Sequence, residues 1–244
     1  MIVLNAGVPR SGTVLVNAII RELYKLAGRE IRLANPLQSE LPELIADLQR
    51  TGADETEIVL IHTHTWDAET ARLLRGSRHV TGTINFRDPR DVCVSLMRLH
   101  DHEVEQAAQT VEAYFDFVSA TVASVNLMVI PYELLAAEKR AHIFQIAGRL
   151  RIWPSMRVVE RVDAVTSIER HKRIMEKVRA GDVPGLAIRQ NSKRQMSEDT
   201  ESLINDRHIQ SGASGRWRNE LQPDVQKTLT ARFAPLLKRF GYAE

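Results

Sequence analysis

The chain has 244 residues, enough to bury one substantial core or two small ones, and its 43% hydrophobic and 26% charged residues are typical of a globular protein. Its formal net charge of +2 does not suggest a nucleic-acid partner, and no apolar run approaches the roughly 20 residues of a membrane-spanning helix. The single cysteine, Cys93, excludes an internal disulfide framework and lies in an apolar run. We therefore expect a buried thiol, no membrane partner and, since no signal peptide is evident, a cytoplasmic location.

Strands alternate with helices along the first 150 residues. The apolar run at 2–6 predicts a buried strand, and apolar residues on a helical period predict a helix over 14–27. The same reasoning predicts strands over 57–61, 79–86 and 126–131, and helices over 36–50, 67–75, 88–99, 103–124 and 132–148. The helix over 36–50 is begun by Asn35-Pro36, and its predicted apolar face is Leu37, Leu41, Leu44, Ile45 and Leu48. This order favours βαβ units and a parallel sheet.

The rest of the chain is more polar. Residues 155–180 are predicted to be helical and rich in Arg and Lys, and 223–240 to form a helix with one apolar face that Gly241 ends. Residues 181–215 carry few large apolar side chains, so we assign them no secondary structure and expect a mobile loop or lid at about 181–215. We interpret residues 1–244 as a single domain.

A polar side chain follows each of the four predicted strands. They are Arg10, His64, Arg87 and Tyr132. Ligands of parallel sheets bind at the carboxyl ends of the strands, so we expect these side chains to lie at one site.

The loop after the first strand has the composition of a phosphate cradle. The spacing from Gly7 to Gly12 matches the first half of a Walker loop, but Thr13 stands where the Walker lysine belongs. The sequence therefore argues against ordinary ATP or GTP hydrolysis, which needs that lysine on the β- and γ-phosphates. The cation comes earlier, at Arg10, and the loop amides together with the helix N-terminus favour an anion. We predict anion binding by Pro9, Arg10, Ser11, Gly12 and Thr13. The alternative is a tight turn without a ligand.

The loop sequence GVPRSGT resembles the 5′-phosphosulfate loop of the sulfotransferases, which use 3′-phosphoadenosine 5′-phosphosulfate (PAPS). The resemblance implies an α/β, P-loop-like three-layer fold with a central, mostly parallel sheet flanked by helices. It also implies transfer of a sulfuryl group to a hydroxyl or amine with release of 3′,5′-ADP (PAP), without a metal. Arg10 would then stabilise the leaving phosphate.

A second segment resembles the family's 3′-phosphate motif, in which an arginine ends a strand and a serine follows eight residues later. Arg87 and Ser95 match both positions. The alternative is a simple Asp-Pro helix start with a solvated arginine. Tyr132, after the fourth strand, resembles the family's adenine-contacting tyrosine; a lone tyrosine is otherwise more often a core residue.

A third segment, His62-Thr63-His64, resembles the Lys-Thr-His of cytosolic sulfotransferases, whose histidine is the catalytic base. The resemblance makes His64 the base, and His62 replaces the lysine. A neutral imidazole suits this role near pH 7. Two histidines that merely cap a strand are the alternative. A zinc site is disfavoured because no third ligand is evident.

The family's late motif, Arg-Lys-Gly-x-x-Gly-x-Trp, is partly present. Gly212, Gly215 and Trp217 match, whereas Gln210 and Ser211 replace the two cations. We expect Gly212, Trp217 and Arg218 to contact the cofactor, with Arg207, Arg216 or Arg218 substituting for the lost charges.

Two other functions stay open. A small-molecule kinase with an atypical P-loop would need Mg²⁺, and a catalytically degenerate nucleotide-binding protein would bind PAP without turnover. For a sulfotransferase, we expect this chain to bind a small-molecule or glycan acceptor rather than a nucleic acid. The sequence predicts neither which acceptor is used nor the oligomeric state.

Overall fold

The computed structural model describes residues 1–50, 57–75, 77, 79–183, 185–190, 195–199, 203–205 and 212–243. Within these residues the main sheet has five strands, all parallel, in the order β2-β3-β1-β4-β5. The strands are β1 (Ile2–Gly7), β2 (Ile31–Ala34), β3 (Ile58–Thr63), β4 (Val80–Phe86) and β5 (Met128–Pro131). Because β1 is central, the loop that follows it is flanked by the carboxyl ends of β3 and β4.

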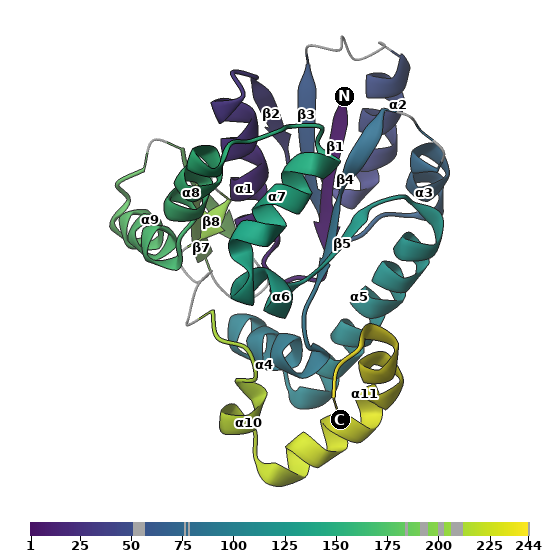
Figure 1. Ribbon diagram of the computed structural model, residues 1–244. Coiled ribbons are helices and arrows are strands. Elements are labelled where there is room, and N and C mark those ends of the chain that lie inside the picture. The colour runs from purple at the N-terminus through teal and green to yellow at the C-terminus, as the bar shows by residue number, and fades with distance from the viewer. Residues whose placement is uncertain are drawn as a thin grey trace.

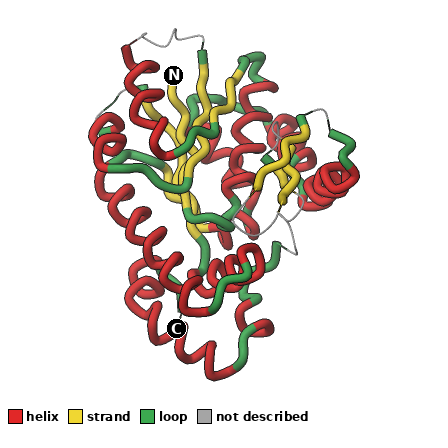
Figure 2. The backbone as a smooth tube through the Cα atoms, turned by 180° about the vertical axis from the view of Figure 1, so that it is seen from behind, coloured by secondary structure: helices red, strands yellow, loops and turns green. Residues whose placement is uncertain are grey.

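Helices cover both faces of this sheet, as Figures 1 and 2 show from opposite sides. One face packs against α1 (Thr13–Leu26), α6 (Tyr132–Ala137), α7 (Lys139–Arg149) and α8 (Met156–Val165). The other packs against α2 (Leu41–Arg50), α3 (Ala68–Leu74), α4 (Pro89–His100), α5 (Val104–Ser124) and α11 (Pro223–Phe240). The fold is therefore the three-layer α/β arrangement expected from the sequence.

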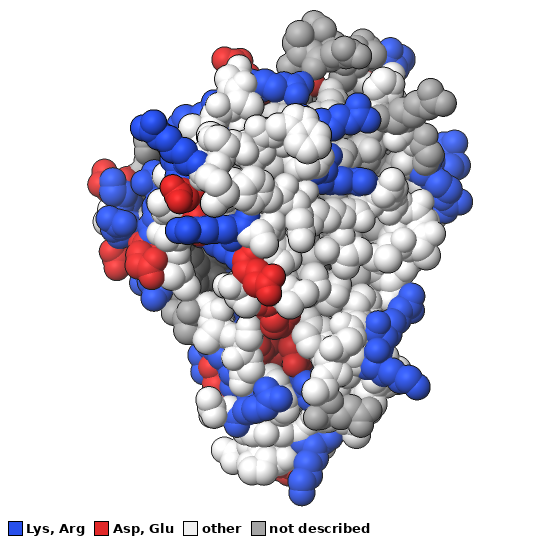
Figure 3. Space-filling view, viewed as in Figure 1, with Lys and Arg blue, Asp and Glu red and all other residues white. Residues whose placement is uncertain are grey.

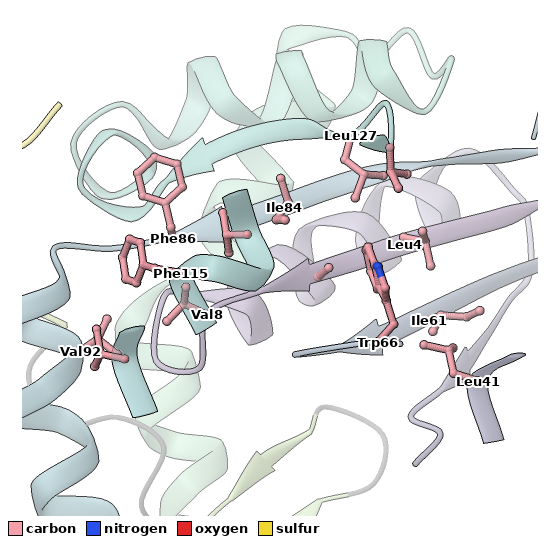
Figure 4. Close-up of a cluster of buried hydrophobic side chains, with 14 of the residues drawn as sticks. Leu4, Val8, Leu41, Ile61, Trp66, Ile84, Phe86, Val92, Phe115 and Leu127 are labelled. Carbon is pink, nitrogen blue, oxygen red and sulfur yellow. The ribbon is translucent and has the colours of Figure 1, made fainter. Parts of the chain in front are cut away.

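Buried side chains of the strands alternate between the two faces of the sheet, so a hydrophobic core forms on each face. Leu4 of β1 and Ile84 of β4 face the α4 and α5 side, where Phe86 and Phe115 pack together (Figure 4). Val3 faces α1 on the other side. Side chains of a strand alternate between the faces of a sheet, so the polar Asn5 must lie on the α1 side, beneath the loop.

A second, smaller sheet lies within the segment 181–215. Its strands β6 (Leu186–Gln190), β7 (Gln195–Asp199) and β8 (Ile204–Asn205) are antiparallel. Leu203 and Ile204 are buried against Val14 of α1 and Met175 of α9 (Ile168–Ala180), which attaches this sheet to the main body. The sequence left this segment without secondary structure, because its short strands lack a continuous apolar run.

Residues 31–50 differ from the sequence prediction in two ways. The strand β2 was not predicted, because it is a short, half-buried edge strand. The helix expected over 36–50 begins only at Leu41, after the short 3₁₀ turn η1 (Gln38–Glu40), and Leu37 is 66% exposed instead of lying on the apolar face. The residue before a proline avoids the helical region, so Asn35-Pro36 extends the chain here.

Two helices that were predicted as continuous are divided. The stretch 132–148 breaks at Glu138, whose backbone leaves the helical region. The stretch 155–180 breaks at Thr166 and Ser167, and the Ser167 hydroxyl accepts a hydrogen bond from the Arg170 amide to begin α9. The short helix α10 (Trp217–Glu220) was not predicted.

The outer surface carries both signs of charge. Lys and Arg side chains are interspersed with Asp and Glu on the face in Figure 3, in keeping with the net charge of +2. None of the helices in the described ranges is long and apolar enough to cross a bilayer.

Candidate active site at the carboxyl ends of the parallel strands

The loop between β1 and α1 has the backbone of an anion cradle. Gly12 is the N-cap of α1 with φ of 86°, a conformation that favours glycine, and a Cβ there would lie 2.7 Å from the Tyr132 ring. Arg10 also has a positive φ, 69°, which is uncommon for a side-chain-bearing residue. No side chain caps α1, and no acid lies in its first turn. The helix N-terminus is therefore open to an anion.

Buried amides hold this loop from beneath. The Asn5 side chain donates to the Thr13 carbonyl at 2.7 Å and to Asn17 Oδ1 at 2.6 Å. Its oxygen accepts from Thr83 Oγ1 at 3.1 Å and from Asn85 Nδ2 at 2.6 Å. All of these side chains are buried. The network ties β1, β4 and α1 together under the cradle, so the loop is positioned before any ligand arrives.

Three guanidinium groups line one cavity of about 460 Å³ above the loop. They belong to Arg10, Arg87 and Arg216, which come from three distant segments of the chain. The pKa of Arg10 is lowered to about 10, chiefly by burial and then by repulsion from Arg87 and Arg216. An anion bound in the cavity would offset this repulsion, because a nearby opposite charge favours the protonated form of arginine.

Arg87 is held at the start of α4 by a buried ion pair. Its Nη2 lies 2.9 Å from Asp91 Oδ2, and it also donates to the Ala213 carbonyl. Its guanidinium stacks over the Tyr132 ring at 4.6 Å. These contacts fix the orientation of the planar fork toward the cavity.

Asp91 also ties in the segment 212–217, which we call the late segment. Its carboxylate accepts the Gly215 amide at 2.7 Å and the Trp217 amide at 3.1 Å. The Tyr132 hydroxyl donates to the Gly212 carbonyl at 2.6 Å from the other side. The late segment is thereby bound to both α4 and α6, although more than 100 residues separate it from α4.

His64 is oriented as a proton acceptor. Its Nδ1 lies 2.8 Å from the Gly7 carbonyl, which can only accept, so Nδ1 carries the proton and Nε2 has the lone pair. Burial, and then the positive charge of Arg10, lower its pKa below the usual 6.5. The imidazole is therefore neutral near pH 7.

His62 lies beside His64, with the two ring centroids 4.8 Å apart in a T-shaped arrangement. It is 7% exposed, and neither ring nitrogen has a hydrogen-bond partner. Burial, followed by repulsion from His64, lowers its pKa to about 3. His62 therefore supplies no positive charge near neutral pH.

No protein-family model matches the chain, and no curated protein matches it by sequence. Among solved structures, a retinol dehydratase in complex with androsterone and the inactive cofactor PAP matches with a TM-score of 0.63 and 19% identity, over 97% of this chain and 80% of that one. A retinol dehydratase with retinol and PAP matches at 0.60 and 19%, over 97% and 81%. The mouse sulfotransferase SULT7A1 complexed with PAP matches at 0.61 and 16%, over 97% and 84%.

This chain has the sulfotransferase fold. The likeness covers nearly the whole chain, so the fold that the motif resemblance implied is confirmed. At 16–19% identity the likeness establishes the fold alone.

The cavity brings together eight of the residues singled out from the sequence. Its lining includes Arg10, Gly12, Thr13, Arg87, Ser95, Tyr132, Gly212 and Arg216. Arg10 Nε donates to Ser95 Oγ at 2.8 Å, so the predicted 5′ and 3′ halves of the site are in contact. Residues that match the family's motifs in four separate segments of the sequence therefore line the same cavity.

Other predicted residues lie outside the described lining of this cavity: Pro9, Ser11, His64, Trp217 and Arg218. The Ser11 hydroxyl donates to the Val8 carbonyl at 2.6 Å and so shapes the loop. The buried Trp217 ring contacts the guanidinium of Arg90 at 4.0 Å and that of Arg218 at 4.3 Å. Arg216, by contrast, does line the cavity. The predicted positions Arg207, Gln210 and Ser211 lie outside the described residues.

Several lining residues were missed by sequence reasoning. The far wall comes from the α8–α9 junction, where Thr166, Ser167 and Ile168 line the cavity. Asp91 and Asn5 were also missed. Asn5 interrupts an apolar strand, and Asp91 follows Arg87 by four residues across a helix start; these were the available signals. At the α8–α9 junction the available signal was Ser167, whose hydroxyl caps α9.

In the described part of the chain, no cluster of three or more His, Cys, Asp or Glu side chains is arranged to hold a metal ion. The lone thiol, Cys93, is buried, and burial raises its pKa to about 12.

Proposed function

We propose that this protein transfers a sulfuryl group from PAPS to an acceptor hydroxyl or amine. The observation that carries the proposal is the convergence of Arg10, Arg87 and Arg216 on one cavity beside the uncapped N-terminus of α1. Such a site suits a ligand with phosphate groups at two separate places. The fold, shared with proteins crystallised with PAP, supports this choice of nucleotide.

The residues divide between two ends of the nucleotide. Arg10 and the amides of Gly12 and Thr13 would hold the 5′-phosphosulfate, while the Ser11 amide donates to the Val8 carbonyl and shapes the loop. Arg87 and Ser95 would hold the 3′-phosphate, as in the motif that they resemble. Arg216 lies on the same cavity and would replace one of the cations absent from positions 210 and 211.

The adenine end would be formed by other residues. Tyr132 lies between Arg87 and Gly212, and the apolar side chain of Ile168 lines the same cavity. The backbone at Gly212 would cradle the nucleotide from the late segment. Trp217 and Arg218 would act by packing beneath this segment.

PAPS, when bound, supplies a sulfuryl group that is activated because its leaving group is a phosphate. His64 accepts the acceptor's proton at Nε2, and the Gly7 carbonyl holds the opposite nitrogen in place. Arg10 stabilises negative charge that develops on the departing phosphate oxygen. His62 is neutral here, so Arg10 is the cation assigned to this step.

The proposal extends to context as well. The acceptor is a small molecule or a glycan, and the androsterone and retinol bound by structures of the same fold support the first class. We further propose a cytoplasmic, single-domain protein in which residues at about 181–215 act as a lid. No metal is assigned a role.

The test is the melting temperature with PAP, 5′-AMP, ATP–Mg²⁺ or buffer. A ligand present at roughly 100 times its Kd stabilises the folded state by about 2.7 kcal/mol. We expect PAP to raise the melting temperature of the wild type and of the control Arg72→Ala, at an exposed arginine on α3 that does not line the cavity. Arg87→Ala should lose the PAP-induced shift. Each shift is taken from the variant's own unliganded value, because the substitution also leaves Asp91 buried without its partner.

Turnover separates an enzyme from a degenerate binding protein. With PAPS and a panel of hydroxylated small molecules and glycans, His64→Gln should retain the PAP-induced shift while PAP release falls about 100-fold or more. A shift with PAP but no wild-type turnover would favour the non-catalytic alternative. A shift only with ATP–Mg²⁺ would favour the kinase.

A further inference from the structure

Residues 241–243, which follow α11, fold back onto the start of α4; we call them the brace. Gly241 has φ of 77°, and the Tyr242 amide donates to the Leu237 carbonyl at 2.8 Å, which ends α11 and turns the chain. Figure 1 shows this end of the chain beside α4. Neither Tyr242 nor Ala243 lines the cavity, so any effect of the brace on a ligand passes through other residues.

The first arm of the brace is Tyr242. Its hydroxyl donates to Glu133 Oε2 at 2.8 Å, and Glu133 Oε1 accepts the Asp88 amide at 3.0 Å. Burial and the adjacent Glu133 raise the pKa of Tyr242, so its hydroxyl stays a donor. Glu133 immediately follows Tyr132, and Asp88 immediately follows Arg87. This arm therefore connects two neighbours of cavity-lining side chains.

The second arm is the Ala243 carbonyl. It accepts from Arg90 Nη2 at 2.7 Å, and the same guanidinium is paired with Asp88 at 2.9 Å. Arg90 is 1% exposed and stacks over Trp217 at 4.0 Å. Trp217 in turn donates its amide to Asp91, the partner of Arg87. The second arm therefore reaches the late segment.

We propose that the brace positions the 3′-phosphate clamp, so that Tyr242 and Arg90 determine how strongly the protein distinguishes PAP from 5′-AMP. This inference rests on the proposed function. Both arms converge on the start of α4, which presents Arg87, and no contact of the brace reaches the 5′ loop at residues 9–13 in the described structure. Loosening the brace should therefore weaken binding of the 3′-phosphate and leave the 5′ end unaffected.

The experiment measures Kd for PAP and for 5′-AMP, which lacks the 3′-phosphate, by titration calorimetry. Tyr242→Phe keeps the ring and removes the hydroxyl. We expect it to weaken PAP binding by about fivefold and to leave 5′-AMP binding unchanged. Glu133→Gln, which weakens the same arm from the other end, should move the ratio of the two Kd values in the same direction.

Arg232→Ala is the matched control. Arg232 joins α11 to α5 through Glu112 at 2.8 Å, away from the brace, so its removal loosens α11 without touching the start of α4. A purely structural brace would lower the melting temperature in all three variants and leave the ratio of Kd values unchanged. That result overturns the inference. An equal change in the ratio of the Kd for PAP to the Kd for 5′-AMP in Arg232→Ala also overturns it. A wild type that binds PAP no more tightly than 5′-AMP overturns the proposed cofactor site as well.

Discussion

At the scale of single residues, His62 is unusual because it is a buried polar side chain without a hydrogen-bond partner. It lies opposite Asn5 in the register of β3 and β1, on the face of the sheet that carries the phosphate loop. Desolvation rather than a countercharge sets its protonation state. His62, which stands where the family motif has a lysine, is therefore neutral near pH 7.

This protonation state predicts acid sensitivity. Between pH 6.5 and about 3, the unfolded chain binds a proton at His62 that the folded chain does not, so stability falls as the pH falls. His62 should lower the free energy of unfolding by up to about 1.4 kcal/mol for each pH unit below 6.5. Above pH 6.5 it should have no such effect.

Urea denaturation from pH 7.5 to 5 checks this prediction. His62→Gln should flatten the pH dependence by about one proton relative to the wild type. Equal slopes in the wild type and His62→Gln would contradict the assignment.

At the scale of elements, the start of α4 organises the site. Four charged side chains here are buried and point in two directions: Arg87, Asp88, Arg90 and Asp91. Arg87 lines the cavity and pairs with Asp91, which binds the late segment, while Asp88 and Arg90 face α11 and the brace. One turn of helix thus joins the cavity to the end of the chain.

The attachment of the late segment can be tested through Asp91→Asn. The substitution removes the charge that accepts the Gly215 and Trp217 amides. A hydrogen bond to a charged group contributes about 1.5–3 kcal/mol, so these two amides should exchange with solvent roughly 10- to 100-fold faster. Hydrogen exchange read by NMR measures this, with the amides of β4 as the internal reference. Unchanged protection of both amides would show that Asp91 does not hold the segment.

At the scale of the whole molecule, the small sheet β6–β8 shares a core with the main body. Leu203 and Ile204 pack against Val14 and Met175, and Val14 lies in the first turn of the helix that follows the phosphate loop. We therefore expect one cooperative unfolding transition, with calorimetric and van't Hoff enthalpies that agree. PAP should shift this transition as a unit. Two resolved transitions, with only one moved by PAP, would mean that the segment 181–215 unfolds independently.

Much of this architecture follows from local sequence. The strands β1 and β3 are apolar runs and β4 alternates apolar with polar residues, while Gly12 and Asp88-Pro89 begin the helices that follow β1 and β4. The placing of Arg10, Arg87 and Tyr132 after strands was enough to predict that they would meet, because parallel strands share one carboxyl edge. These features depend on neighbouring residues and on a general property of parallel sheets.

Tertiary structure alone decided the rest. The α8–α9 junction reaches the cavity only through the packing of distant segments, and two of the groups that Asp91 binds, the Gly215 and Trp217 amides, lie more than 100 positions away. The charge state of His62 likewise depends on the layers that exclude water from it. Hydrophobic period and turn chemistry act over a few residues, whereas burial, ion pairing and pKa depend on which distant segments pack together.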